Sequence, residues 1–162
     1  MKKEWFGPKG RFDCLLIGME ERLSVRDGLV DVWEVSVRSS HDFLSEEDMD
    51  GLKPFVRSAI MEVPECWGGR DQSGRWVAFM GMDGVKLEML FVDPAMQGQG
   101  LGRYLVEVAI HERGIRQVDV NEQNPGAAGF YRRMGFVPYG RSERDGQGNP
   151  FPLLHLEWGG RL

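Results

Sequence analysis

The sequence predicts a mixed α/β fold in which helices flank a mostly antiparallel central sheet that contains one parallel pair of strands. Two observations predict this class. Short apolar runs separated by turn residues occupy residues 65–69, 76–81 and 86–92, a pattern typical of consecutive antiparallel strands. A helical pattern and a further strand follow, up to residue 120, and a strand–helix–strand succession of this length joins parallel neighbours.

Two helices are predicted before these strands. Apolar residues recur near helical spacing over about residues 29–38, at Leu29, Val32, Trp33 and Val37. Ser45 is followed three positions later by Asp48, which is a capping pattern, so a second helix should start there and run to about residue 61. Pro54 fits such a helix only in its opening turns or at a kink.

Helices and strands alternate in the rest of the chain. Asp83-Gly84 is a strong hairpin signal between two of the strands, and Gly114 is a usual stop for the helix that precedes it. The pattern predicts, in order, a helix over residues 100–112, a strand over 115–120, a helix over 127–134, and strands over 136–144 and 152–158.

The composition limits the number of domains and the class of partner. With 162 residues, of which 41% are hydrophobic and 28% charged, the chain is expected to form one domain over residues 1–162. A formal net charge of −5 argues against a nucleic-acid partner, because that affinity depends mainly on clustered Lys and Arg. No run approaches the roughly 20 apolar residues of a membrane span, and the first ten residues do not read as a signal peptide.

The cysteines give no sign of a metal site. Cys14 and Cys66 stand far apart, without a His or Cys at metal-ligand spacing. We therefore expect two reduced thiols, a cytoplasmic location and no bound metal.

A glycine-rich segment at residues 92–103 lies directly between a predicted strand and a predicted helix. Gly98, Gly100 and Gly102 lack a Cβ atom, so the backbone can turn sharply there and its amides can approach an anion. The helix that follows adds its positive N-terminal end. The segment therefore predicts a pyrophosphate cradle, although a glycine-rich turn at such a junction can also be only a turn.

Two other phosphate-binding motifs fit this segment poorly. A Walker loop ends in Gly-Lys-Ser or Gly-Lys-Thr, whereas Gly102 is followed by Arg103 and Tyr104. A dinucleotide fingerprint needs its third glycine one position later. Asp119 lies at a suitable distance for the ribose contact of that fingerprint, but the antiparallel strands before the motif do not fit a doubly wound fold.

Two signatures in this region resemble those of the GNAT family, the GCN5-related N-acetyltransferases. The first, Q/R-x-x-G-x-G/A, is matched by Gln97, Gly100 and Gly102. The second, N-x-x-A-x-x-(F/L)-Y-x-x-x-G-F, is matched over residues 124–136. Within the family, the chain resembles small bacterial acetyltransferases that carry a Ser-Val-Arg-x-x-His segment, here at residues 36–41.

The resemblance implies the GNAT fold, in which the strand that ends at Val92 carries a bulge and splays from its parallel neighbour. It implies acetyl-CoA as co-substrate, with backbone groups of Leu90, Phe91 and Val92 beside the pantetheine arm and the Val92 amide on the acetyl carbonyl. The amides implied to hold the pyrophosphate are those of Gln97, Gly98, Gln99, Gly100, Leu101 and Gly102, and Arg103 is a further cofactor-binding candidate. Asn124 would contact the pantetheine or cap the helix that follows. The N-terminal strand of the family has a poorer match here, at residues 14–18.

The resemblance also implies catalytic roles. Tyr131 matches the general acid that protonates the departing thiolate; alternatively it packs with neighbouring aromatic residues. Glu88 is the best candidate for the base, or for one end of a water relay, because it interrupts an apolar strand on the face expected for Leu90 and Val92. It can instead be an ion-pair partner.

The acceptor pocket is implied to lie under the first two helices and the loop between the last two strands. Its candidates are Trp33, His41, Phe43 and Tyr139, together with the loop over residues 141–149. His41 and His155 are residues of a type that more often packs or lies at the surface than takes part in catalysis.

Together, these features predict an N-acetyltransferase that moves an acetyl group from acetyl-CoA directly to a primary amine of a small molecule or a protein, in a ternary complex. Neither cysteine lies in the motifs, so no cysteine nucleophile is required. The alternative is a non-catalytic acyl-CoA-binding module or sensor. The sequence does not name the acceptor amine, and although homodimers are common in the family, no residue indicates an interface.

Overall fold

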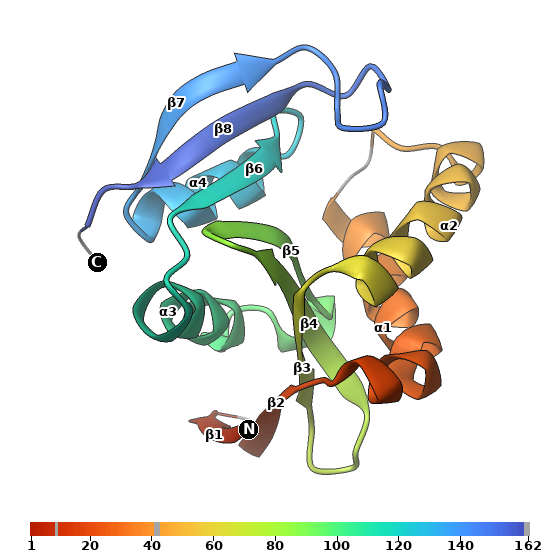
Figure 1. The fold of residues 1–162 in the computed structure, drawn as a ribbon, viewed down its shortest axis with the longest axis vertical. Helices are drawn as coiled ribbons and strands as arrows, with labels where there is room; N and C mark the ends of the chain where they lie inside the picture. The colour runs from red at the N-terminus through yellow and green to blue at the C-terminus, as the bar shows by residue number, and fades with distance from the viewer. Residues whose placement is uncertain (9, 41–42, 161–162) are drawn as a thin grey trace.

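The computed structural model describes residues 1–8, 10–40 and 43–160. One eight-stranded sheet runs through them in the spatial order β1-β2-β3-β4-β5-β6-β8-β7, and helices pack on both of its faces (Figure 1). The strands are β1 (Lys2–Gly7), β2 (Gly10–Leu16), β3 (Glu65–Arg70), β4 (Trp76–Asp83), β5 (Lys86–Val92), β6 (Gln117–Asn121), β7 (Phe136–Ser142) and β8 (Leu153–Trp158). The helices are α1 (Met19–Ser40), α2 (Glu46–Glu62), α3 (Leu101–Arg113) and α4 (Pro125–Arg133), with a short 3-10 helix, η1 (Pro94–Met96).

The strand pairing confirms a mostly antiparallel sheet with one parallel pair. Strand β5 is antiparallel to β4 and parallel to β6. The parallel contact is short and consists of the pairs Lys86–Gln117 and Leu87–Val118. Beyond Leu87 the two strands diverge, so the sheet opens beside the second half of β5, as the family resemblance implied.

Two hydrophobic clusters lie on opposite faces of the sheet. Helices α1 and α2 cover one face, where Leu29 and Trp33 join the cluster of Phe79. Helices α3 and α4 cover the other face, where Leu105 joins the cluster of Val77; Figure 1 shows the two helix pairs on their separate sides. Because helices cover both faces, β4 is buried along nearly its whole length, which explains its continuous apolar sequence.

The first helix is longer than the sequence pattern predicted. It begins at Met19 rather than near Leu29. The pattern fails over the first part of α1 because a core position there carries a charged residue, Arg22, which is 2% exposed, whereas the neighbouring Leu23 is 64% exposed. The apolar period that identifies an amphipathic helix is therefore absent from this stretch.

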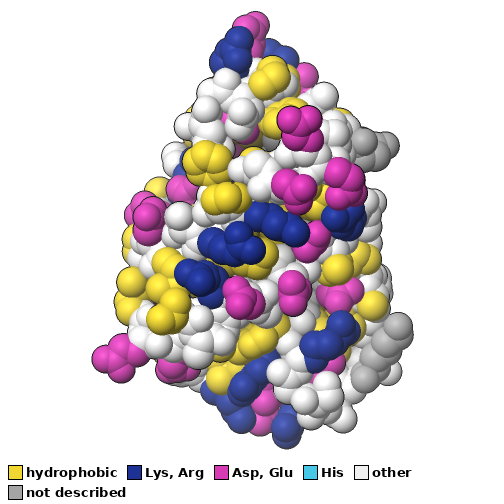
Figure 2. Space-filling view, turned by 90° about the vertical axis from the view of Figure 1, so that its right-hand side faces the viewer, with side chains coloured by type: hydrophobic (Ala, Val, Ile, Leu, Met, Phe, Trp, Pro, Cys, Tyr) yellow, Lys and Arg dark blue, Asp and Glu magenta, His cyan; other side chains and the backbone are white. Residues whose placement is uncertain are grey.

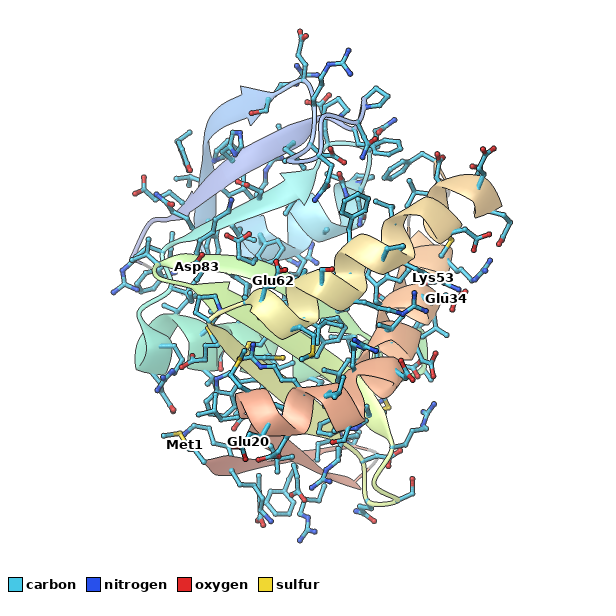
Figure 3. The ribbon with its side chains drawn as sticks, turned by 45° about the vertical axis from the view of Figure 1, so that its right-hand side comes forward. Met1, Glu20, Glu34, Lys53, Glu62 and Asp83 are labelled. Carbon is cyan, nitrogen blue, oxygen red and sulfur yellow. The ribbon has the colours of Figure 1, made fainter. Side chains whose placement is uncertain are left out.

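The second helix starts where the capping pattern placed it. Ser45 Oγ accepts a hydrogen bond from the Asp48 amide, and the Asp48 carboxylate accepts one from the Ser45 amide, both at 3.0 Å, which is a capping box. Pro54 lies in the middle of α2 and not in its opening turns. On the outer surface Lys53 of α2 lies 3.1 Å from Glu34 of α1 (Figure 3), so the two helices are also tied by charge.

The N-terminal residues form a hairpin that the sequence pattern did not predict. The strand expected at residues 14–18 is β2, which begins earlier, at Gly10, and pairs with an additional strand, β1. Trp5 of β1 packs on Phe12 at 5.4 Å and on Tyr104 of α3 at 6.2 Å between ring centroids. The hairpin thus places an aromatic ring against the first turns of α3.

Candidate active site

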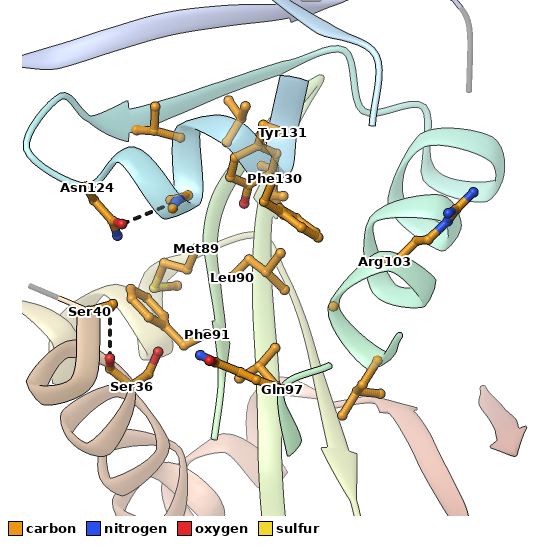
Figure 4. A pocket seen from close by; sticks show the side chains of 18 of the residues that line it. Ser36, Ser40, Met89, Leu90, Phe91, Gln97, Arg103, Asn124, Phe130 and Tyr131 are labelled. Atoms are coloured by element: carbon orange, nitrogen blue, oxygen red, sulfur yellow. Dashed lines mark hydrogen bonds between the residues drawn. The ribbon is translucent and has the colours of Figure 1, made fainter. Parts of the chain in front are cut away.

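A cavity of about 690 Å³ opens where β5 and β6 diverge. It is lined by β5, β6, the C-terminal end of α1, the segment before α3, the first turn of α3 and one side of α4 (Figure 4). The residues singled out from the sequence that line it are Glu88, Leu90, Phe91, Val92, Gln97, Gly98, Gly100, Leu101, Gly102, Arg103, Asn124 and Tyr131. Gln99 lies outside this lining, and its side-chain amide donates to the Ala95 carbonyl at 3.4 Å.

The segment before α3 directs backbone donors toward this cavity. Gly98 and Gly100 have φ values of 78° and 85°, which residues with a side chain rarely adopt. The first hydrogen bond of the helix runs from the Tyr104 amide to the Gly100 carbonyl at 2.9 Å. The amides of residues 101–103 precede that bond and lie at the positive end of the helix. Such donors suit a phosphate or pyrophosphate group.

The second half of β5 turns backbone groups toward the opening in the sheet. The Asp93 amide donates to the Val77 carbonyl of β4 at 2.8 Å, and successive residues of an antiparallel pair alternate between the two sides. Leu90 and Val92 therefore direct their N–H and C=O groups away from β4, toward the side from which β6 has diverged. An extended molecule with amide groups can pair with such an edge as a further strand would.

Tyr131 reaches the cavity from α4. Its side chain is 6% exposed and makes T-shaped contacts with Phe130 and Phe136, at 5.1 Å and 5.6 Å between ring centroids. Figure 4 shows its hydroxyl pointing into the cavity. Burial raises the pKa of this hydroxyl above its ordinary value of 10.0, so it keeps its proton at neutral pH. Tyr131 thus packs in the core and also offers a proton to the cavity.

Asn124 and Arg103 line the cavity from the starts of α4 and α3. The Asn124 side-chain oxygen accepts a hydrogen bond from the Ala127 amide at 3.1 Å, which confirms the capping interpretation. Arg103 lies on the outer side of α3 and its guanidinium is 3.0 Å from the Glu107 carboxylate. A helix cap and a surface ion pair therefore border the cradle.

Glu88 lies at a β-bulge in the strand beside the cavity. The register of β4 with β5 shifts where Gly81 faces Met89 and Met82 faces Leu87, so Glu88 is the extra residue of β5. At a bulge, side chains no longer alternate regularly between the two faces of the strand. Leu87, before the bulge, and Leu90 and Val92, after it, all belong to or pack on the hydrophobic cluster on the α3 side of the sheet. The bulge interrupts the regular alternation by which Glu88 was expected to share a face with Leu90 and Val92, and all three residues line the cavity.

The environment of Glu88 favours its protonated form more than water does. Its side chain is 39% exposed, and Lys86 Nζ lies 3.9 Å from its carboxylate. Partial burial raises the pKa of Glu88, the nearby carboxylates of Asp119 and Asp83 raise it further, and Lys86 offsets part of this increase. A carboxylate of this kind is a stronger proton acceptor than an ordinary surface glutamate.

A second cavity, of about 500 Å³, lies between the α1–α2 pair and β5. Its acidic residues are Glu62 of α2, Asp83 at the end of β4, and Glu88; Figure 3 labels the first two. Its apolar walls are formed by Trp33, Leu52, Phe55, Val56, Ala59, Val63, Pro64, Met89 and Phe91. Glu88, Met89 and Phe91 line both cavities, so the two meet at the bulged part of β5.

Comparison with known proteins decides the family. The family model of the acetyltransferase (GNAT) domain matches residues 64–138. Peptidyl-lysine N-acetyltransferase YjaB of Escherichia coli strain K12 is 43% identical over 132 residues, which are 82% of this chain and 89% of that relative. The chain belongs to the GNAT family. The protein of the same name from Salmonella typhimurium is 41% identical over 128 residues, which are 79% of this chain and 88% of the relative.

Solved structures agree with membership in the GNAT family. The solution structure of apo-form YjaB from Escherichia coli matches with a TM-score of 0.79 at 39% identity, covering 92% of this chain and 98% of that one. A GCN5-related N-acetyltransferase from Rhodopseudomonas palustris has the same fold at 17% identity, with a TM-score of 0.67 and coverage of 96% and 97%. The predicted GNAT fold and N-acetyltransferase activity are thereby confirmed.

GNAT acetyltransferases use acetyl-CoA, and the first cavity fits such a molecule. The backbone donors of residues 98–103 suit its diphosphate, and the outer edge of β5 suits the two amides of its pantetheine arm. In the described part of the chain, no group of three or more His, Cys, Asp and Glu side chains is arranged to hold a metal ion.

The GNAT resemblance named four acceptor residues, and the structure does not bring all of them together. Trp33 lines the second cavity. Phe43 packs on Phe151 at 5.7 Å, and Tyr139 is 55% exposed beside His155; neither is among the described residues that line the two cavities. His41 lies outside the described residues. The loop over residues 141–149 reaches the second cavity through Gln147.

Five polar residues that line the first cavity were not among the acetyltransferase site candidates from the sequence, namely Ser36, Ser40, Asp119, Asn121 and Arg133; Asp119 was considered only for the rejected dinucleotide fingerprint. Ser36 opens the Ser-Val-Arg-x-x-His segment, and helical spacing puts Ser40 on the same face. Asp119 stands between Val118 and Val120, which are buried on the α3–α4 side. Because side chains of a strand alternate between its two faces, this pattern could have indicated that Asp119 points to the face of the sheet opposite to Val118 and Val120.

On the side of α1 and α2, the visible surface has acidic, basic and apolar side chains interspersed, without a large patch of one charge (Figure 2).

The two cysteines are buried. Burial raises the pKa of Cys14 to about 12 and that of Cys66 to about 11, so both thiols are poor nucleophiles. Among the described residues, no helix combines the length and apolar character that crossing a membrane requires.

Proposed function

We propose that this GNAT acetyltransferase transfers the acetyl group of acetyl-CoA to the ε-amino group of a lysine side chain in a peptide or protein. The observation that carries the proposal is the position of Glu88, which lines both cavities at the point where they meet. One cavity offers donors for a diphosphate, and the other combines apolar walls with carboxylates. A thioester and a cationic amine that enter from the two sides therefore meet beside a proton acceptor.

Acetyl-CoA is proposed to occupy the first cavity. The amides of residues 98–103 would hold its diphosphate, and the outward N–H and C=O groups of Leu90 and the C=O of Val92 would pair with its pantetheine amides, which leaves the Val92 N–H for the acetyl carbonyl. This arrangement would place the thioester near the opening of the sheet, within the same cavity as the Tyr131 hydroxyl. Asn124 would border the pantetheine arm while it caps α4.

A lysine side chain suits the second cavity. Its four-carbon stem would lie against apolar walls such as Trp33 and Phe91, and its ammonium group would be attracted by the carboxylates of Glu62, Asp83 and Glu88. The relatives from Escherichia coli and Salmonella typhimurium are named peptidyl-lysine N-acetyltransferases. Both the chemistry of the cavity and these names support lysine over an anionic or purely apolar acceptor.

The proposed reaction uses three proton transfers. Glu88 takes one proton from the lysine ammonium, and the free amine attacks the thioester carbonyl, whose oxygen would receive a hydrogen bond from the Val92 amide. As the C–S bond breaks, the departing sulfur receives a proton from Tyr131, and the nitrogen of the new amide loses its second proton, which returns through solvent to the Tyr131 oxygen. Glu88 then releases its proton to solvent, so the reaction as a whole yields the acetylated lysine, the CoA thiol and one proton.

The test is transfer to a lysine-containing peptide, measured by thiol release and by the mass of the peptide. Tyr131→Phe should lower kcat by about 10- to 1000-fold with little change in acetyl-CoA affinity, because one hydroxyl is removed at a buried site. Tyr104→Phe makes the same chemical change on α3, outside the lining of the cavity, and should leave kcat unchanged. Binding of acetyl-CoA without turnover on peptides, amino acids or polyamines would instead identify a sensor.

The wider predictions from the sequence belong to the same proposal. We propose that residues 1–162 act as one catalytic domain, which the continuous sheet from β1 to β7 supports. The cytoplasmic location and a homodimeric assembly stay predictions, and subcellular fractionation and light scattering, respectively, would test them.

A further inference from the structure

A chain of polar side chains crosses four neighbouring strands beside Glu88. Lys86 Nζ on β5 lies 2.6 Å from Asp119 Oδ2 on β6. Asp119 Oδ1 lies 2.6 Å from His155 Nδ1 on β8. His155 Nε2 lies 2.7 Å from Ser142 Oγ on β7. The register explains the contacts, because Asp119 and His155 are direct cross-strand partners.

The direction of the hydrogen bonds follows from the groups themselves. An ionised carboxylate can only accept, so the proton of a neutral His155 ring belongs on Nδ1, and Nε2 then accepts from the Ser142 hydroxyl. Lys86 donates to the other carboxylate oxygen. Both oxygens of Asp119 are therefore engaged, and His155 fixes the orientation of the carboxylate.

Asp119 itself is poorly suited to accept the proton of the acceptor amine, although it lines the first cavity. Its side chain is 18% exposed. Burial alone would raise its pKa, but the hydrogen bonds from Lys86 and His155 outweigh burial, and the pKa of Asp119 is lowered. Its role is therefore better understood through its effect on Lys86.

Lys86 lies between two carboxylates and is much nearer to one of them, at 2.6 Å from Asp119 and 3.9 Å from Glu88. We propose that Asp119, fixed by His155, is a positioning residue that holds the Lys86 ammonium away from Glu88, so that the Glu88 carboxylate stays free to accept a proton from the acceptor amine. This inference rests on the proposed function, in which Glu88 is the base.

The charged groups around Glu88 set the expected sign. Lys86 precedes it on β5, Asp119 faces it from β6, and Asp83 faces it from β4; Glu62 of α2 lines the same second cavity. If Asp119 lost its charge, a negative neighbour would disappear and Lys86 would lose its nearer partner and turn to Glu88. Both changes favour the ionised form of Glu88 and make it a weaker base.

The order Ser142, His155, Asp119 also invites comparison with a hydrolytic triad. Two features argue against that role. Ser142 is not among the described residues that line either cavity, and the carboxylate that would serve His155 is shared with Lys86. The network is therefore better explained as support for the site around Glu88.

The test compares variants that move the Glu88 equilibrium in opposite directions. Asp119→Asn keeps a side-chain oxygen for His155 but removes the charged partner of Lys86. The acid limb of the pH profile of kcat/KM should therefore move to lower pH, and the maximum value of kcat/KM should fall by up to about 10-fold. Lys86→Met removes the cation, and the acid limb should move to higher pH. Glu122→Gln is the control: it removes a carboxylate in the turn after β6, where Glu122 pairs with Arg141. The pH profile of kcat/KM should not shift in this variant.

A second measurement is independent of turnover. Titration of the Glu88 side-chain carboxyl by carbon-13 NMR should show the same opposite shifts in Asp119→Asn and Lys86→Met. Shifts in the same direction, or an unmoved Glu88 titration in Asp119→Asn, would overturn the inference even if the wild type is an active acetyltransferase. A wild type that turns over no amine, while the NMR shifts appear as expected, would instead contradict only the proposed function.

Discussion

The guanidinium of Arg22 donates a hydrogen bond to the carbonyl oxygen of Val63 and so connects the start of α1 with the end of α2. Further carbonyl oxygens in the same region accept from it, namely those of Ile17, Ile60, Met61 and Pro64. The last carbonyls of a helix have no partner within the helix. A buried cation therefore satisfies the end of α2 and fixes the wall of the second cavity that α2 provides.

Replacement of Arg22 by Met should lower the free energy of unfolding by about 3 kcal/mol, because several buried carbonyl groups lose their donor. Urea denaturation, followed by circular dichroism, measures this loss. Arg57→Met on the exposed side of α2 removes the same charge and should change stability by less than about 0.5 kcal/mol. Equal effects of the two substitutions would show that charge alone, and not the buried contacts, explains the result.

Gly100 tests the cradle for the diphosphate. Its φ of 85° is costly for a residue with a side chain, and the backbone there aims the amides that precede the first bond of α3. Gly100→Ala should cost about 1–2 kcal/mol of stability and weaken CoA binding, as measured by calorimetry.

Gly100→Asn distinguishes the cost of the left-handed backbone from the cost of steric crowding. Asn has a larger side chain than Ala but tolerates a left-handed backbone better. The position has room, since the nearest atom to an added Cβ is Trp5 Cζ2 at 3.7 Å. We expect the Asn variant to keep more stability and more CoA affinity than the Ala variant. The reverse order would mean that steric filling, and not backbone conformation, governs this position.

The pH dependence of kcat/KM should be set on its acid side by Glu88. The pKa of Glu88 is raised above 4.5, first by partial burial, so activity should be present above that raised value and be lost as the pH falls through it. Burial raises the pKa of Tyr131 above 10.0, so deprotonation of Tyr131 should cause no loss below that pH. Glu88→Gln should abolish the acid limb, and an unchanged limb in this variant would assign it to another group.

The ion pair of Glu65 and Arg113 predicts a loss of stability in acid. The Arg113 guanidinium donates to the Glu65 carboxylate with Nε at 2.9 Å and is the main cause of the lowered pKa of Glu65. Because the folded pKa lies below the unfolded one, the stabilisation is present above the unfolded value and is lost as the pH falls through the folded value.

Glu65→Gln should therefore lower the unfolding free energy at neutral pH by about 1–2 kcal/mol, and the difference from the wild type should shrink as the pH falls through the lowered pKa of Glu65. Glu122→Gln, in an exposed pair with Arg141, should leave the stability nearly unchanged, because solvent screens such a pair. Urea denaturation midpoints of both variants, measured at several pH values, test this difference. Equal effects of Glu65→Gln and Glu122→Gln would show a general effect of removing a carboxylate and not a specific contribution of the Glu65–Arg113 pair.

Much of the fold could be predicted from local patterns in the sequence. The strands β3, β4 and β5 and the helix α3 follow apolar runs and glycine stops, and Ser45 marks the start of α2 as expected. The start of α1 could not be predicted, because Arg22 is buried through contacts with carbonyls that are distant in sequence. The β1–β2 hairpin was missed because β1 begins with three charged residues and none of its six residues is buried.

Part of the candidate site could also be predicted from local sequence, and part could not. The cradle for the diphosphate lies within residues 97–103, so its motif indicated its position directly. The neighbours of Glu88 depend on a bulge opposite Gly81 and Met82 and on the register of β6, β8 and β7. Such long-range pairing brings Asp119 and His155 to the site, and a single-sequence pattern does not contain it.

The most direct test of the coenzyme site is an NMR titration of nitrogen-15-labelled protein with acetyl-CoA. The account predicts that the largest amide shifts occur at residues 98–103 and at Leu90 and Val92, with smaller changes on β1 and β7. Saturating acetyl-CoA that leaves these amides unmoved, or that shifts a separate surface instead, would contradict it.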